Sequence, residues 1–361
     1  MSSQPSYGYL EEEVYVEQPL GFVVKNHEDK VCVHTNGDIL LVCLYVDDLI
    51  FTGNNPSLFE AFKKDISHEF EMTDVGPMSY YQSIEVKQME DGIFISQESY
   101  TKEILKKFNM LDCNPVNTPM ESGTKLSKFD VGEKVDPTFF KSLVGSLRYL
   151  TCTRPDILFA VGVVSRFMEA PTSTHLKVTR RILRYLKGTI DFGLFYSSSN
   201  DFNLVEFCDS DYAGDIDDRK STTGFVFFLG DSVISWSSKK QSIVTLSTCE
   251  AEYIAATSCT YHAIWLRRLL KELNLPQMEA TEICIDNKSA QALAKNPVYH
   301  DRSKHIDTMY HFIRKCVAKK EVELKYVKSH DQVADIFTKP HKFEDFQRLR
   351  TRLGLKKKNQ N

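Results

Sequence analysis

The sequence predicts an α/β protein, chiefly from the order of elements in its C-terminal half. Three successive strand patterns, at 202–211, 223–229 and 232–236, are followed by helical patterns that alternate with two further strands. A meander that gives way to alternating helices and strands favours a mixed five-stranded sheet with flanking helices. The N-terminal part instead alternates predicted hairpins with short helices.

Length and composition indicate two or three compact units. The chain has 361 residues, of which 42% are hydrophobic and 26% charged, ordinary values for a globular protein. A net charge of -4 argues against a uniformly basic nucleic-acid binder, so any polyanion site must be local. The acidic N-terminus is unlike a signal peptide, and no later apolar run could cross a bilayer. We expect a soluble, intracellular protein without a membrane partner; cytoplasm and nucleus are not distinguished.

The nine cysteines are scattered, and none forms a Cys-x-x-Cys pair. This pattern suggests neither a zinc site nor a disulfide framework, and it favours a reducing compartment. We also expect no small-molecule cofactor.

The first motif is "ILLVCLYVDDLIF", where Asp47 and Asp48 stand between two runs of strand-forming residues. Two strands joined by a tight turn would present these carboxylates at a hairpin tip, where phosphoryl-transfer sites often bind metal. Aspartate is also favoured in ordinary turns, so the motif alone leaves both interpretations open.

Helical spacing of apolar residues predicts helices at 57–70 and 100–108. Between them, alternating patterns on both sides of Asp91-Gly92 predict a hairpin. The apolar face of the first helix would consist of Phe59, Phe62, Ile66 and Phe70.

Three prolines and two glycines make 113–137 a predicted linker. The following region is helical up to residue 187, in three pieces, because Pro155 and Pro171 suit first helical turns and Gly188 suits a helix end. The remaining predictions are a short strand at 194–196, a long helix at 250–273, a strand at 281–286, helices at 287–295 and 306–319, a strand at 322–327 and a final helix from about Gln332.

Four acids of the last region stand at the ends of predicted elements, where functional residues of open sheets gather. Asp209 closes the first strand in phase with Val205 and Phe207, and Glu252 lies in the first turns of the long helix. Asp286 ends the fourth strand, and Asp335 lies near the start of the final helix. Four ionised carboxylates would repel one another unless divalent cations joined them, and hard oxygen ligands favour Mg²⁺ or Mn²⁺. Two such ions can support phosphodiester hydrolysis.

Acids at strand ends and in first helical turns also occur as caps and as partners of the helix dipole, so any one of the four could be structural. Spacing does not separate Asp209 from its acidic neighbours, or Asp335 from an acid one helical turn earlier. These alternatives are Asp211, Asp215, Asp217, Asp218 and Asp331.

Several long motifs resemble the Pol polyproteins of copia-type retrotransposons. The segments "CDSDYAGD", "DRKSTTGFVFFL", "ISWSSKKQSIVTLSTCEAEYIAA", "CIDNKSAQALAKNP", "HDRSKHIDTMYHFIR" and "VKSHDQVADIFTKP" are similar to their ribonuclease H domain, in the same order. "SLVGSLRYLTCTRPDILFAVGVVSRFMEAP" resembles the connection region before that domain, and "EEEVYVEQPLGF" and "LYVDDLIFTGN" resemble parts of the reverse transcriptase palm. The likeness covers nearly the whole chain.

The resemblance implies an α+β remnant of a polymerase palm and thumb, followed by a ribonuclease H-like mixed five-stranded sheet. It divides the chain into a truncated reverse transcriptase remnant (1–112), a linker (113–137), a helical connection region (138–200), a ribonuclease H-like domain (201–340) and a basic tail (341–361).

By the same resemblance, the catalytic metal-binding carboxylates would be Asp209, Glu252, Asp286 and Asp335, which would hold two Mg²⁺ or Mn²⁺ ions. His330 would assist product release or proton transfer; the alternative is a solvent-facing loop histidine.

The palm departs from the family pattern at two places. The family has a further aspartate on the strand before "LEEEVYVEQP", where this chain reads "SSQPSYGY". It also has a long fingers and palm stretch between "EQPLGF" and the YVDD hairpin, which is missing here. One lost ligand already threatens a two-ion site, so we interpret Asp47 and Asp48 as relics without polymerase activity.

The expected partner is an RNA/DNA hybrid, which proteins recognise by its shape and its 2′-hydroxyls. Weak candidates for phosphate contacts are Lys239, Lys240, Arg302, Lys304 and His305. The leading functional hypothesis is a ribonuclease H that cuts the RNA strand endonucleolytically. A catalytically silent nucleic-acid binding or assembly module is the alternative, and residual reverse transcription is the least favoured; protein partners and oligomeric state stay open.

Overall fold

The computed structural model describes residues 32–35, 38–45, 48–295 and 307–358, and the chain divides into two compact units at residue 78. We refer to them as the N-terminal unit (1–78) and the C-terminal unit (79–361). Among the described residues, no helix combines the length and the apolar character needed to cross a bilayer.

The described part of the N-terminal unit is a small antiparallel sheet with one helix. Pairing of Tyr45 with Asp48 confirms the predicted hairpin, and Asn55 caps the helix by accepting from the Ser57 N–H at 2.9 Å. Leu40, Phe62 and Ile66 form its buried core. Phe70 is 56% exposed, against expectation, because the helix ends one residue earlier and the chain turns extended there. The elements are β1 (Cys32–Thr35), β2 (Asp38–Tyr45), β3 (Asp48–Gly53) and α1 (Pro56–Glu69).

Among its described residues, the C-terminal unit has two five-stranded sheets. One has the order β10-β9-β8-β11-β12, and the other has the order β13-β7-β6-β5-β4. The strands are β4 (Tyr80–Tyr81), β5 (Ile84–Met89), β6 (Gly92–Ser96), β7 (Phe192–Ser197), β8 (Leu204–Ser210), β9 (Thr222–Leu229), β10 (Ser232–Lys240), β11 (Thr281–Ile285), β12 (Val322–Tyr326) and β13 (Leu355–Lys357).

The first of these sheets confirms the predicted fold class. Strands β8, β9 and β10 form an antiparallel meander, and β11 runs parallel to both β8 and β12. Along β8, Leu204, Glu206 and Cys208 are buried on one face, and Asp209 is in phase with the residues of the other.

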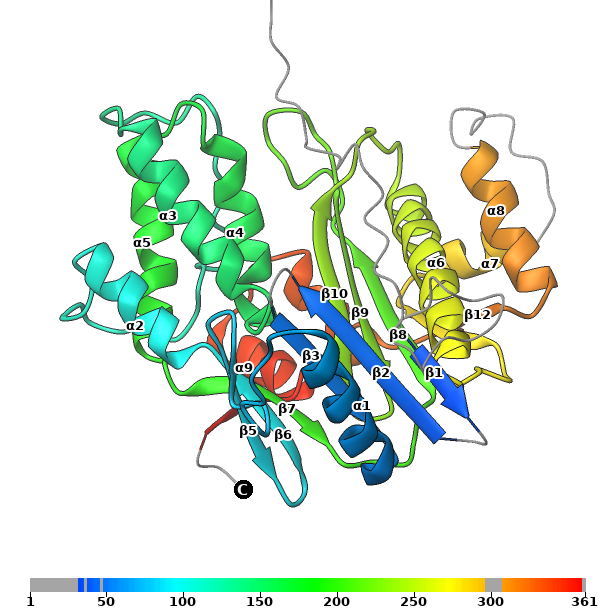
Figure 1. Ribbon diagram of the computed structural model, residues 1–361. Helices are drawn as coiled ribbons and strands as arrows, with labels where there is room; N and C mark the ends of the chain where they lie inside the picture. The colour runs from blue at the N-terminus through cyan, green and yellow to red at the C-terminus, as the bar shows by residue number, and fades with distance from the viewer. Residues whose placement is uncertain (1–31, 36–37, 46–47, 296–306, 359–361) are drawn as a thin grey trace, which may run out of the picture. The chain divides into compact units, whose positions relative to one another are not determined.

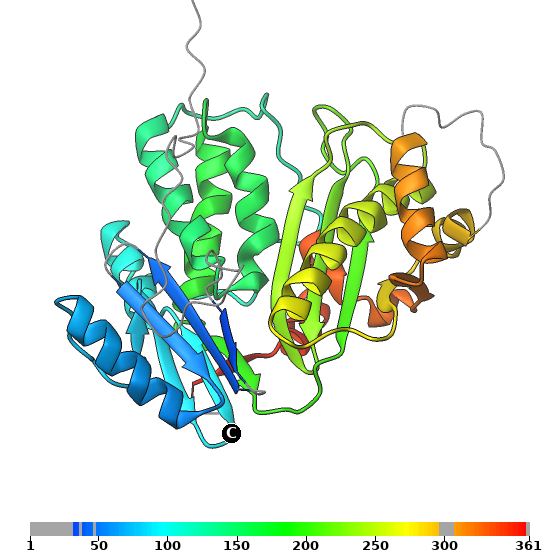
Figure 2. The same cartoon turned by 45° about the vertical axis from the view of Figure 1, so that its right-hand side comes forward.

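Helices cover both faces of this mixed sheet (Figures 1 and 2). The long α6 crosses one face together with α7 and α8, and α4 and α9 lie on the opposite side. The helices are α2 (Glu98–Lys107), α3 (Pro137–Leu150), α4 (Leu158–Val164), α5 (Ser173–Lys187), α6 (Thr248–Glu272), α7 (Lys288–Lys295), α8 (Asp307–Ala318) and α9 (Phe343–Arg352), with 3-10 turns η1 (Pro155–Ile157), η2 (Ser165–Phe167), η4 (Ser329–Asp331) and η5 (Val333–Phe337).

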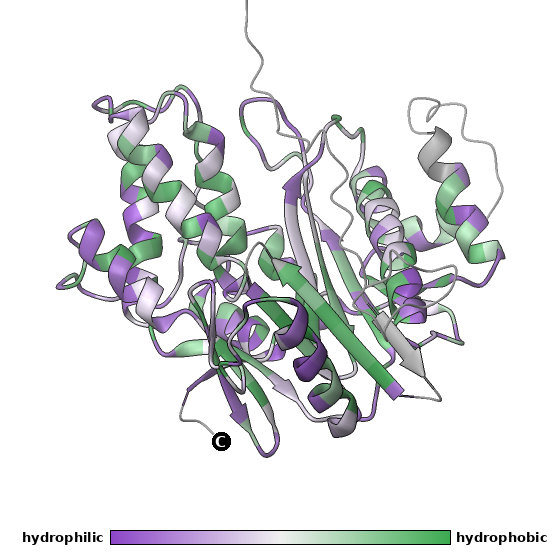
Figure 3. Cartoon of the chain, viewed as in Figure 1, coloured by the Kyte–Doolittle hydropathy of each residue, from purple (hydrophilic) through white to green (hydrophobic). Residues whose placement is uncertain are grey.

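One hydrophobic core joins the α3–α5 helices to the mixed sheet. It runs from Phe140 and Leu147 of α3 to Val226 of β9, Phe337 of η5 and Phe346 of α9. Hydrophobic and hydrophilic residues accordingly alternate around α3, α4 and α5 (Figure 3). The α3–α5 helices thus form one side of the body that carries the sheet.

The final helix predicted from about Gln332 is wrong. The buried Gln332 amide donates to the main-chain oxygens of Cys208 and Cys284, at 2.9 and 3.2 Å, which docks the segment across β8 and β11. A short 3-10 turn, η5, follows, and Pro340 has no N–H with which to continue a helix.

The residues expected to form a basic tail are largely ordered and packed. Phe346, Leu349 and Leu353 are buried along one face of α9, and β13 pairs with β7. The hairpin β5–β6 joins the same sheet, so the two compact units do not coincide with the five predicted regions. The functional division of the chain stays a prediction.

Candidate metal centre

Three of the predicted acids come together at one end of the mixed sheet. Asp209 from β8, Glu252 from α6 and Asp286, directly after β11, each offer a carboxylate oxygen within 4.8 Å of the others. Asp209 and Glu252 are buried, and Asp286 is half-buried. Together with Asp335 they are called the acidic cluster below.

The Glu252 side chain is buried, where its ionised form is unfavourable. Ser247 caps α6 by accepting from the Glu250 N–H at 3.2 Å, which fixes the start of the helix and so the direction of Glu252. The side chain is 6% exposed, and its Oε2 has no hydrogen-bond partner among the described residues. Burial, together with the charges of Asp209 and Asp286, raises the pKa of Glu252 to about 10.

Asp335 joins the cluster beside Asp209. Burial and the neighbouring charge of Asp335 raise the pKa of Asp209 to about 6, and burial raises the pKa of Asp335. The Thr338 hydroxyl donates to Asp209 Oδ2, and Lys339 Nζ lies 2.9 Å from Asp335 Oδ1. The Thr338 hydroxyl and the Lys339 ammonium therefore offset part of the negative charge of these two carboxyl groups.

Asp286 forms the more open edge of the cluster. Its Oδ2 accepts from the Ser329 hydroxyl at 2.7 Å, so the η4 turn orients this carboxylate.

The neighbouring acids face other groups. Asp211 Oδ1 accepts from the Thr222 N–H inside the β8–β9 loop, and burial raises its pKa to about 6. Asp215 accepts from Arg166 at 3.1 Å and from Lys240 at 2.6 Å. Asp217 accepts from Ser127 at 2.5 Å, and Asp331 is exposed.

The other predicted site residues lie in diverse surroundings. His330 follows Ser329, but its side chain is 72% exposed and contacts Asp331 at 3.3 Å. Lys239 is exposed, whereas Lys240 also pairs with Asp218 at 2.9 Å, which neutralises much of its charge. Asp48 is exposed at the start of β3. Arg302, Lys304, His305 and Asp47 lie outside the described residues.

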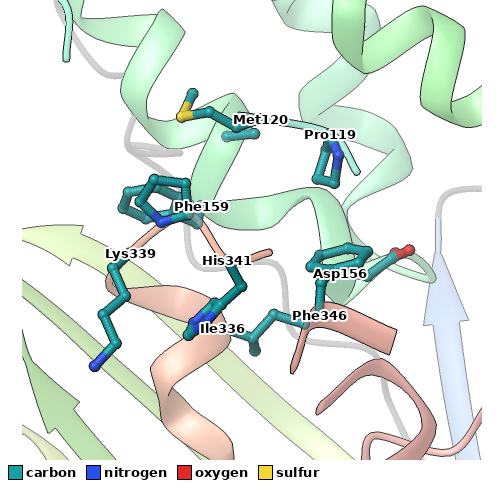
Figure 4. Close-up of a pocket in the computed structure, with 10 residues that line it drawn as sticks. Pro119, Met120, Asp156, Phe159, Ile336, Lys339, His341 and Phe346 are labelled. Carbon is teal, nitrogen blue, oxygen red and sulfur yellow. The ribbon is translucent and has the colours of Figure 1, made fainter. Parts of the chain in front are cut away.

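Sequence reasoning missed Thr338, Lys339 and His341, which surround Asp335. His341 Nε2 lies 3.0 Å from the main-chain oxygen of Asp335, and burial lowers the pKa of this histidine. His341 and Lys339 also line a small pocket with Phe159 and Met120 (Figure 4). The spacing of Asp335 and Lys339, four residues apart, was the available signal.

The residues present fit a divalent cation. The cluster supplies hard carboxylate oxygens, which suit Mg²⁺ or Mn²⁺ better than softer metals. The partnerless Glu252 oxygen is a buried acceptor that a cation would satisfy. Fold and cluster together define a ribonuclease H-like α/β protein.

Comparison with known proteins gives the family. The sequence model described as "Reverse transcriptase (RNA-dependent DNA polymerase)" matches residues 32–122. The retrovirus-related Pol polyprotein from transposon RE1 of Arabidopsis thaliana is 37% identical, across 96% of this chain and 26% of the relative. An uncharacterized mitochondrial protein of the same plant is 41% identical, across 63% of this chain and 94% of that protein. The chain belongs to the copia-type retrotransposon Pol polyprotein family.

The chain spans about a quarter of the length of that polyprotein. Among solved structures, the N-terminal ribonuclease H domain of a Mycobacterium tuberculosis protein is similar at 13% identity and a TM-score of 0.30, covering 42% of this chain and 97% of that one.

Proposed function

We propose that the C-terminal unit is a metal-dependent ribonuclease H that hydrolyses the RNA strand of RNA/DNA hybrids endonucleolytically. The observation that carries the proposal is the convergence of Asp209, Glu252 and Asp286 within 4.8 Å, with a buried Glu252 oxygen left without a partner among the described residues. A glutamate that served only as a helix-end acid would have a donor or a counter-charge at this oxygen.

In this proposal Asp209, Glu252 and Asp286 hold one ion, and Asp209 and Asp335 hold the second. When bound, two such ions supply an activated water and stabilisation of the departing 3′ oxygen. Ser329 keeps Asp286 oriented, and Gln332 fixes the strand ends that carry Asp209 and Asp286. His330, on the exposed η4 turn, would assist proton transfer or product release.

A hybrid-cleavage assay with Mg²⁺ tests the proposal. The full chain should cut the labelled RNA of a hybrid, and Asp286→Asn should abolish cutting without unfolding the protein. Asp231→Asn is the matched control, because this acid is exposed in the turn between β9 and β10. A folded protein that cuts nothing in Mg²⁺ or Mn²⁺ would favour the alternative, a silent nucleic-acid binding or assembly module.

We further propose that the N-terminal unit has lost polymerase activity. The palm aspartate and the stretch before the YVDD hairpin are missing from the sequence, and Asp48 is exposed at the start of β3. Primer extension on an RNA template should give no product above a heat-denatured sample. Any processive product would contradict this part of the proposal.

A further inference from the structure

The two sides of the acidic cluster are compensated differently. Beside Asp209 and Asp335, the chain itself supplies a hydroxyl from Thr338 and an ammonium from Lys339. On the side of Glu252, the buried Oε2 meets no hydrogen-bond donor among the described residues. Asp335 Oδ1 also has no hydrogen bond there, but the Lys339 ammonium lies 2.9 Å away as its counter-charge. One side therefore lacks a counter-charge, and a lysine neutralises the other.

Lys339 reaches the cluster because of the tight turn after Asp335. The main-chain oxygen of Asp335 accepts from the N–H groups of Thr338 and Lys339, at 3.2 and 3.3 Å. This turn brings the two side chains to the same side, and Figure 4 shows the Lys339 amino group extending away from Phe159 and His341. The stem of the side chain thus lines the pocket, while the ammonium contacts Asp335.

The ion pair is able to open. The Lys339 side chain is 48% exposed, whereas that of Asp335 is 11% exposed. A rotation of the lysine into solvent would leave Asp335 in place, still attached to the same turn. The carboxylate would then face Asp209 with no cation between them, which is unfavourable unless another cation enters.

We infer that Lys339 is a positioning residue that stands, in the metal-free protein, where the second divalent ion would bind at Asp209 and Asp335. The inference rests on the proposed function. Binding of a first ion beside Glu252 would leave Lys339 in place, but binding of a second would require its displacement. Lys339 would thereby keep Asp335 aligned and set the metal concentration at which the second site fills.

Isothermal titration of the metal-free full chain with MgCl₂, and separately with MnCl₂, tests this without substrate. Lys339→Met should bind the second ion about fivefold more tightly, the size that a partly exposed ion pair implies. The metal-free variant should also melt at a lower temperature, and added metal should restore its melting temperature. Lys339→Arg keeps the charge and should resemble the wild type, and exposed Lys342→Met is the matched control.

A double-variant cycle asks whether Lys339 acts through Asp335. In an Asp335→Asn background, Lys339→Met should no longer change metal binding. Equal second-ion affinity in the wild type and Lys339→Met would overturn the inference, as would loss of the second site in Lys339→Met. Absence of metal binding in every protein, with folding intact, would instead remove the proposed nuclease function itself.

Discussion

Two groups of buried charges in the C-terminal unit are compensated in opposite ways. In the first, Arg154 binds Asp156 through two contacts of 2.9 Å, and Tyr185 donates to the same carboxylate at 2.5 Å. Thr189 accepts from Arg154 at 2.7 Å, and Arg350 donates to the Tyr185 hydroxyl at 2.9 Å. We call these five residues the arginine network, which ties α5 and α9 to the turn before α4.

The carboxylates of the two groups respond to burial differently. Burial opposes ionisation of Asp156, but the charge of Arg154 outweighs it and lowers the pKa of that carboxyl. In the acidic cluster, burial and like charges act together and raise the pKa of Glu252. A fully compensated buried charge indicates a structural role. A cluster that lacks a counter-charge at Glu252 and opens to solvent at Asp286 instead indicates a site for a cation.

The largest expected effect is on hybrid cleavage, and it should distinguish two acids that stand two residues apart, Asp209 and Asp211. Asp209→Asn should reduce hybrid cleavage by roughly a thousandfold or more, because this carboxylate would contact both ions. Asp211→Asn should stay within about threefold of the wild type, because an amide oxygen still accepts from Thr222 N–H. Single-turnover cleavage at saturating Mg²⁺ measures both. An equal loss of cleavage rate in the two variants would contradict the assignment of Asp209, rather than Asp211, as the metal ligand.

A substitution in the arginine network should change the stability of the protein but not its response to Mg²⁺. Arg154→Met should lower the free energy of unfolding by about 3–5 kcal/mol, since it leaves Asp156 buried without its charge partner. Urea titration followed by tryptophan fluorescence suits this test, because both tryptophans, Trp236 and Trp265, lie in the C-terminal unit. Mg²⁺ should not restore the loss, and exposed Arg148→Met should change little. A full rescue by Mg²⁺ would contradict the proposed separation of roles.

Glu206 is a third kind of buried acid, because it has no charged partner among the described residues and contacts the thiol of Cys259. Burial raises its pKa to about 8, so the folded state holds a proton that the unfolded chain has released above pH 4.5. Stability should therefore fall as pH rises from about 5 to 8.

Glu206→Gln should remove this dependence and stabilise the protein by roughly 2–4 kcal/mol at pH 9 relative to pH 5. Urea unfolding midpoints at pH 5 and pH 9 measure this pH dependence of stability. Exposed Glu323→Gln of β12 is the control. An unchanged pH profile would show that Glu206 ionises freely in the folded protein.

The smallest expected effect concerns the stability of the protein when Glu252 of the acidic cluster is replaced. At pH 7 Glu252 is protonated in the metal-free fold but ionised in the unfolded chain, so Glu252→Gln should stabilise the metal-free protein by roughly 1–3 kcal/mol. The same variant should lose most of the stabilisation that Mg²⁺ gives to the wild type. Melting curves with Mg²⁺ and with a chelator measure both parts. Destabilisation of the metal-free variant would mean that Glu252 has a structural partner.

Much of the fold followed from local rules that the sequence carries. The period of two along β8 placed Asp209 in phase with Val205 and Phe207, and Pro155 stands in a first turn, as expected. Pro171 does not, because α5 begins only at Ser173, after the cap residue Thr172. The order of strand and helix patterns gave the mixed sheet and brought Asp209, Glu252 and Asp286 to element ends. These features depend on neighbours within a few residues, so the linear pattern contains them.

Tertiary structure decided what each charged side chain meets. Only the folded loop shows that Asp211 turns to Thr222 while Asp209 faces the cluster, and only packing buries Glu206. Docking of Gln332 across two strands replaced the expected helix by a 3-10 turn and brought Lys339 to Asp335. Burial and charge compensation arise between surfaces far apart in the chain, and no local period encodes which surfaces will meet.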